Sequence, residues 1–152
     1  MKNGKILIGT DHAGFELKNI LVTYLKENGY NVEDMGAHTL DPEDDYPKLL
    51  IPVAMRVLED PQNIKAIVFG GSGNGEAMIC NRFPEVRAAV YYGGPIEIVK
   101  LSREHNDANV LSLGARFIDE KQMKNVVDLW LTTPFSGDKR HARRIALIDN
   151  IE

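Results

Sequence analysis

The densest group of residues able to do chemistry is the stretch FGGSGNGEAM, residues 69–78. Four of the six residues from Gly70 to Gly75 are glycines, whose backbone N–H groups can turn toward one point and hold an oxyanion or a phosphate. Glu76 follows at once, and a carboxylate beside such an N–H cradle can remove a proton from carbon. A tight turn without a ligand, with Glu76 merely facing the helix dipole, is the alternative interpretation.

Two further pairs of polar residues could have either a role in chemistry or a purely structural role. Asp11 and His12 follow the first apolar run, where Asp11 could simply cap a helix and His12 could donate to a phosphate or polarise a substrate oxygen. His105 and Asn106 lie in the polar segment REHND, where they could equally be a solvated helix end and its C-cap. Residue type alone leaves both alternatives open.

A basic segment near the C-terminus supplies a candidate phosphate grip. Arg140 and Arg144 are four residues apart, so they lie on one helical face and could hold a phosphate dianion at two points. Lys139 and Arg143 favour the plainer interpretation of a basic, solvated face. No metal site is expected, because the four histidines are scattered and Cys80 is the only cysteine.

The elements that must position these residues alternate regularly. Strands are predicted at residues 5–9, 30–36, 65–71, 86–94 and 109–115. Helical periodicity follows these runs, for example at residues 17–25 and 50–58, where Pro52 leaves the first turn of the helix undefined. This order predicts a three-layer, Rossmann-like α/β fold with a five-stranded parallel sheet and helices on both faces.

Ligands of such sheets bind beyond the carboxyl ends of the strands. We therefore expect the residues after the first, third and fourth strands, together with SREHND just before the fifth strand, to converge on one edge.

Composition limits the function classes. The 152 residues, 43% hydrophobic and 26% charged, predict one globular domain over residues 1–152, and the formal net charge of -4 argues against nucleic-acid binding. No apolar run at the N-terminus is long enough for a signal peptide or a membrane span, so no membrane partner and a cytoplasmic location are expected. We expect the terminal helix, residues 138–152, to dock on a neighbouring subunit and Cys80 to be a buried apolar residue.

Six motifs in this order resemble the type B ribose-5-phosphate isomerase family, which includes the subunits of galactose-6-phosphate isomerase. They are GTDHAG (9–14), DYP (45–47), GGSGNGE (70–76), REHND (103–107), LSLGAR (111–116) and KRHARR (139–144). The resemblance covers essentially the whole chain. It implies cofactor-free and metal-free aldose–ketose isomerisation of a small sugar phosphate by a Rossmann-like homodimer, at times paired into tetramers, whose active sites are each built by two chains.

Roles for individual residues follow from the resemblance. The catalytic residues would be Glu76 as base, His105 as the acid that assists ring opening, Asp11 as a proton relay, and Ser72. The substrate would contact Asp11, His12, Gly71, Ser72, Gly73, Asn74, Gly75, Asn106, Arg116, Arg140 and Arg144, with the arginines holding the phosphate. One branch of the family uses a cysteine base at the position of Gly70, so this chain is similar to the branch with glutamate after GSGNG.

The substrate itself stays open at this stage. Ribose 5-phosphate is the first choice, whereas YYGGPIEI, residues 91–98, departs from what a typical ribose enzyme would carry. Allose 6-phosphate, galactose 6-phosphate and a tetrose phosphate are alternatives. A non-catalytic sugar-phosphate or nucleotide sensor is the rival from another class, and it would need neither Glu76 nor His105. A requirement for a different partner chain is disfavoured, because one chain carries both acid and base.

Overall fold

The computed structural model describes residues 2–151, which surround a five-stranded parallel sheet in the order β2-β1-β3-β5-β4. The strands are β1 Lys5–Thr10, β2 Asn31–Asp34, β3 Ile64–Gly70, β4 Ala88–Tyr91 and β5 Val110–Gly114. The chain moves outward from β1 to β2 and then returns to place β3 on the other side of β1. The carboxyl ends of β1 and β3 therefore border the crevice where parallel sheets bind ligands.

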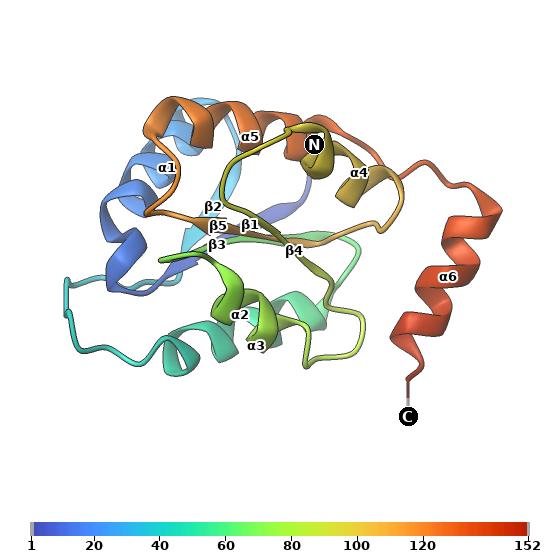
Figure 1. The fold of residues 1–152 in the computed structure, drawn as a ribbon, viewed down its shortest axis with the longest axis horizontal. Coiled ribbons are helices and arrows are strands. Elements are labelled where there is room, and N and C mark those ends of the chain that lie inside the picture. The colour runs from blue at the N-terminus through green and yellow to red at the C-terminus, as the bar shows by residue number, and fades with distance from the viewer. Residues whose placement is uncertain (1, 152) are drawn as a thin grey trace.

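Helices cover both faces of the sheet, as Figure 1 shows, with α1, α4 and α5 on one side and α2 and α3 on the other. The helices are α1 Phe15–Glu27, α2 Tyr46–Glu59, α3 Asn74–Cys80, α4 Glu97–Glu104, α5 Glu120–Thr132 and α6 Lys139–Asp149, with the short 3-10 helix η1 at His12–Gly14. This arrangement confirms the predicted three-layer, Rossmann-like fold.

The core consists of two hydrophobic clusters, one on each face of the sheet. Successive residues of β3 alternate between them: Ile67 and Phe69 face the cluster under α1 and α5, while Ala66 and Val68 face the cluster under α2. Because both faces are covered, the central strands read as unbroken apolar runs. Cys80 is fully buried in the second cluster, and burial raises the pKa of its thiol to about 12, so it behaves as an apolar residue.

Helix α2 begins earlier than its apolar pattern indicates. It starts at Tyr46, and Pro47 occupies its first turn, where the missing N–H has no consequence. The sequence left the first turn undefined because of Pro52, and the structure places Pro52 inside the helix, beyond that turn. The first turn contains no buried residue before Leu50, so it leaves no hydrophobic periodicity in the sequence.

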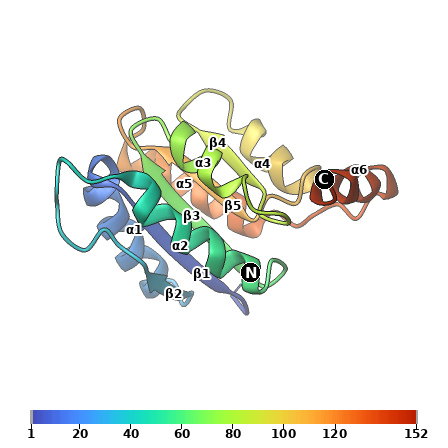
Figure 2. The ribbon, with the colours of Figure 1, turned by 90° about the horizontal axis from the view of Figure 1, so that it is seen from below.

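Helix α6 stands apart from the layers, beside the end of α4 (Figures 1 and 2). It ends at Asp149, three residues before the predicted limit, and Glu152 lies outside the described residues. Its side chains Leu147 and Ile148, with Ile151 just beyond, are at least half exposed. Within residues 2–151, no helix combines the length and apolar character needed to cross a membrane.

Candidate active site

The glycine loop leads from the end of β3 into α3. Gly73 is the N-cap of α3 with φ of 84°, a left-handed conformation that favours glycine. A Cβ atom there would also lie 2.9 Å from Oγ of Ser112, whose hydroxyl donates to the Gly73 carbonyl at 2.6 Å. The backbone N–H of Asn74 donates to Oγ of Ser72. The loop is thereby held in a tight turn at the N-terminus of α3.

Glu76 folds back from the first turn of α3 onto the end of β3. Its carboxylate occupies the space into which a Cβ atom on Gly70 would project, so that any larger residue at position 70 would overlap it. Glycine at position 70 and glutamate at position 76 therefore depend on each other. This overlap gives a steric reason why a chain with its base at position 76 carries no side chain at position 70.

Burial sets the proton affinity of Glu76. The residue is 3% exposed, and its Oε2 has no hydrogen-bond partner among residues 2–151. Burial, followed by the nearby charge of Asp11, raises the pKa of Glu76 to about 7. The helix dipole at the first turn of α3 would lower this pKa, and burial outweighs it. A carboxylate that is half ionised near neutral pH suits a general base.

Asp11 lies at the carboxyl end of β1 and caps η1, since Ala13 N–H donates to its Oδ1 at 2.9 Å. The capping role considered from the sequence is thus correct. Asp11 is nevertheless buried, and burial raises its pKa despite that hydrogen bond. Because its pKa is raised and it lies beside Glu76, Asp11 is suited to proton transfer as well as to capping.

His12 is oriented by an acid that the sequence did not single out. Its Nδ1 lies 2.8 Å from Oδ1 of Asp44, and this hydrogen bond raises the pKa of His12. With Nδ1 engaged, Nε2 is the ring nitrogen available to a ligand. Asp44 sits in the acid-rich loop between β2 and α2, and its only signal in the sequence was its place next to the DYP motif.

Arg116 and Tyr46 flank the glycine loop. A Cβ atom on Gly71 would lie 3.1 Å from Nη1 of Arg116, and one on Gly75 would lie 2.7 Å from Cζ of Tyr46. We call the group at this carboxyl edge the base half-site. It comprises Asp11, His12, the glycine loop 70–75, Glu76 and Arg116.

His105 and Asn106 lie at the opposite edge, so the prediction that SREHND joins the carboxyl edge is wrong for a single chain. Helix α4 runs back against the strand direction, as crossovers between parallel strands require, and His105 is its C-cap. Residues just before β5 therefore lie at the amino ends of the strands. The seven residues of β3 rise about 3.3 Å each, which separates the two edges by about 20 Å.

The basic helix α6 lies beside His105. The rings of His105 and His141 stack with centroids 4.2 Å apart and planes at 18°. Arg140 and Arg144 are exposed on the same helix. We call His105, Asn106, Arg140 and Arg144 the acid half-site; Figure 2 shows α6 at one end of the domain and the loop between β2 and α2 at the other.

No three His, Cys, Asp or Glu side chains within residues 2–151 cluster so that they could hold a metal ion.

A buried carboxylate folded against a glycine loop, at the carboxyl edge of a Rossmann-like sheet, has the geometry to transfer protons on a small anionic ligand. The sequence profile of the ribose/galactose isomerase family matches residues 6–148. The chain belongs to the ribose/galactose isomerase family, which confirms the resemblance seen in the motifs.

Individual relatives span nearly the whole chain. Ribose-5-phosphate isomerase B of Mycobacterium tuberculosis is 38% identical over 152 residues, covering 100% of this chain and 92% of the relative. The crystal structure of ribose-5-phosphate isomerase B from Mycoplasma genitalium with bound ribulose-5-phosphate superposes with a TM-score of 0.93 at 35% identity, covering 98% of this chain and 96% of that one. The enzyme from Clostridium thermocellum is 39% identical with a TM-score of 0.88, covering 95% of each chain.

Proposed function

We propose that this protein interconverts ribose 5-phosphate and ribulose 5-phosphate through an enediolate, with Glu76 as the base. The observation that carries the proposal is the Glu76 carboxylate, which is buried beside the glycine cradle and whose Oε2 has no hydrogen-bond partner among residues 2–151. The Mycoplasma genitalium relative binds ribulose-5-phosphate, which supports the choice of a five-carbon substrate.

In the proposed reaction Glu76 removes the proton from C2 of the open-chain aldose. The electron pair of that C–H bond forms the C1–C2 double bond, and the negative charge moves to the oxygen on C1, where N–H groups of the glycine loop stabilise it. Asp11 passes a proton from the oxygen on C2 to the oxygen on C1. Glu76 then delivers its proton to C1, which leaves the carbonyl at C2. Ser72 shapes the loop by accepting the Asn74 N–H.

The acid half-site of this scheme comes from a second copy of the chain. Within one chain it lies about 20 Å from Glu76, across the length of β3. A neighbouring copy could bring His105 and Asn106 to the base half-site of the first, together with Arg140 and Arg144 on α6. His105 would protonate the ring oxygen during ring opening, and the arginines would hold the phosphate.

The same arrangement gives α6 a partner. Its exposed side chains Leu147 and Ile148 would be covered by the neighbouring copy, which would make the full chain, residues 1–152, one isomerase domain in a symmetric homodimer.

A panel of aldose and ketose phosphates with four, five and six carbons, assayed with the purified protein alone, tests the proposal. We expect ribose 5-phosphate and ribulose 5-phosphate to have the highest kcat/KM. A higher kcat/KM for allose 6-phosphate, galactose 6-phosphate or a tetrose phosphate would reassign the substrate. Binding without turnover across the panel would instead make the protein a sensor.

A further inference from the structure

The turn that carries His105 and Asn106 continues into a residue with a left-handed backbone. Asp107 has φ of 45°, a conformation that is uncommon outside glycine but that aspartate adopts more readily than most residues. Arg103 donates from Nη1 to Oδ1 of Asp107 at 2.9 Å. Arg87 donates from Nη2 to its carbonyl at 3.1 Å. Arg103 on α4 and Arg87, just before β4, thus hold the backbone directly beside the acid half-site.

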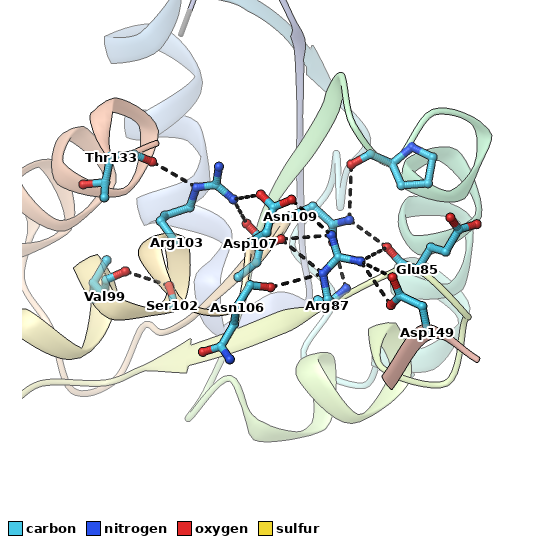
Figure 3. A network of polar contacts seen from close by, with 12 residues as sticks. Glu85, Arg87, Val99, Ser102, Arg103, Asn106, Asp107, Asn109, Thr133 and Asp149 are labelled. Carbon is cyan, nitrogen blue, oxygen red and sulfur yellow. Dashed lines mark hydrogen bonds and ion pairs between the residues drawn. The ribbon is translucent and has the colours of Figure 1, made fainter. Parts of the chain in front are cut away.

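Arg87 reaches farther than this turn. Its Nε donates to the carbonyls of Asn106 and Asp107, each at 3.2 Å, and its Nη1 donates to both carboxylate oxygens of Asp149, at 2.9 and 3.1 Å. Figure 3 shows Arg87 between the turn and the end of α6. The two side chains of this ion pair are only 14% and 17% exposed, so solvent screens it weakly. Arg87 therefore joins the turn that carries His105 to the helix that carries the phosphate arginines.

Helix α6 contacts the domain through residues spaced by four. His141 stacks on His105, Ile145 is buried, and Asp149 pairs with Arg87, so these three residues lie on one face of the helix. Arg140 and Arg144 each lie one residue before a member of this face and remain exposed. Of the three contacts, the Arg87–Asp149 pair is the charge-assisted one and the most directional. It holds the C-terminal end of α6 against the domain, while the His105–His141 stack holds the end that carries Arg140.

We propose that Arg87 and Asp149 are positioning residues that present the acid half-site as one rigid unit. Arg87 fixes the turn of His105, and its pair with Asp149 fixes α6 against that turn. The inference rests on the proposed function, because it assumes that His105 is the ring-opening acid and that Arg140 binds phosphate.

Two variants distinguish the hold on α6 from the hold on the turn of His105 in steady-state assays with ribose 5-phosphate. Asp149→Asn keeps the bonds from Arg87 to the turn but weakens the hold on α6, so KM rises about tenfold while kcat stays near that of the wild type. Arg87→Met also frees the turn of His105, and a misplacement of about 1 Å lowers kcat by about a hundredfold. Arg56→Met is the matched control, because it removes an arginine that pairs with Glu33 and Glu59 on another part of the surface.

Melting temperature and oligomeric state are measured for every variant, and His105→Ala and Arg140→Ala serve as benchmarks. The positioning role would be overturned if Asp149→Asn and Arg87→Met kept the kcat and KM of the wild type while both benchmark variants were impaired. Should Arg87→Met fail to fold, the KM of Asp149→Asn decides alone. A KM defect that disappears at higher protein concentration would mean subunit dissociation and would equally overturn it. Normal kinetics in the two benchmark variants would contradict the proposed function itself, and the positioning role would then have no basis.

Discussion

Replacing Glu76 by glutamine should abolish turnover and at the same time stabilise the fold at alkaline pH. Glutamine keeps the shape of the side chain but cannot accept the substrate proton, so kcat should collapse while sugar-phosphate binding persists. The stability gain follows from burial, because the folded protein must hold a charge at a site where Oε2 has no partner among residues 2–151.

The size and sign of this gain come from the pKa. The ordinary value for glutamate is 4.5, and the folded protein raises it to about 7. At about 1.4 kcal/mol for each pH unit, the ionised carboxylate destabilises the fold by about 3 kcal/mol above pH 7. Because the folded-state pKa is the higher one, this destabilisation grows as pH rises from 4.5 to 7 and vanishes below that range.

Urea unfolding at pH 8 and at pH 4.5, with equal protein concentrations, measures the effect. The quantity to compare is the unfolding free energy of Glu76→Gln minus that of the wild type. We expect this difference to be about 3 kcal/mol larger at pH 8 than at pH 4.5. Wild-type kcat/KM should fall as the pH drops through about 7, where Glu76 takes up its proton. Parallel pH profiles of stability in the two proteins would refute the raised pKa, and near-normal turnover in the variant would refute the base assignment.

Three further predictions concern the same half-site. Gly70→Ala should lower kcat by about a hundredfold in a folded protein, because the new Cβ displaces the Glu76 carboxylate; retained activity would show that the carboxylate has another productive position. Asp44→Asn should lower the pKa of His12 toward its ordinary value, since the Asp44 hydrogen bond is the main cause that raises it, and should weaken substrate binding; an NMR titration with KM measurements checks both, and an unchanged His12 pKa would contradict the assignment. Activity should survive exhaustive treatment with a chelator, because Glu76 and the N–H cradle supply the chemistry; loss with recovery on adding a divalent ion would overturn that mechanism.

The sequence predicts the fold well because its central strands are covered on both faces. Runs such as KAIVFGG read as continuous apolar segments, and their regular alternation with helices leaves few other topologies. The start of α2 escaped prediction because its first turn buries nothing before Leu50.

The site was only partly predictable. The glycine loop and Glu76 are adjacent in sequence, so their shared chemistry is visible without a structure. Asp44 is one of several acids in its loop, and only the folded chain shows that it contacts His12. His105 was assigned to the wrong edge because its neighbourhood was judged from its closeness to a strand, whereas the edge depends on whether a residue precedes or follows that strand.

Mixing two inactive variants tests most directly whether two copies build each site. Glu76→Gln damages the base half-site and Arg140→Ala the acid half-site, so a mixed dimer would keep one site with every functional residue intact. If dissociated chains pair at random from equal amounts, activity should recover to roughly a quarter of the wild-type value in a two-fold symmetric dimer. Glu76→Gln mixed with Gly70→Ala is the matched control and should recover nothing, because both changes damage the base half-site. No recovery with Arg140→Ala, despite mixed dimers seen by native mass spectrometry, would contradict a site shared between two chains.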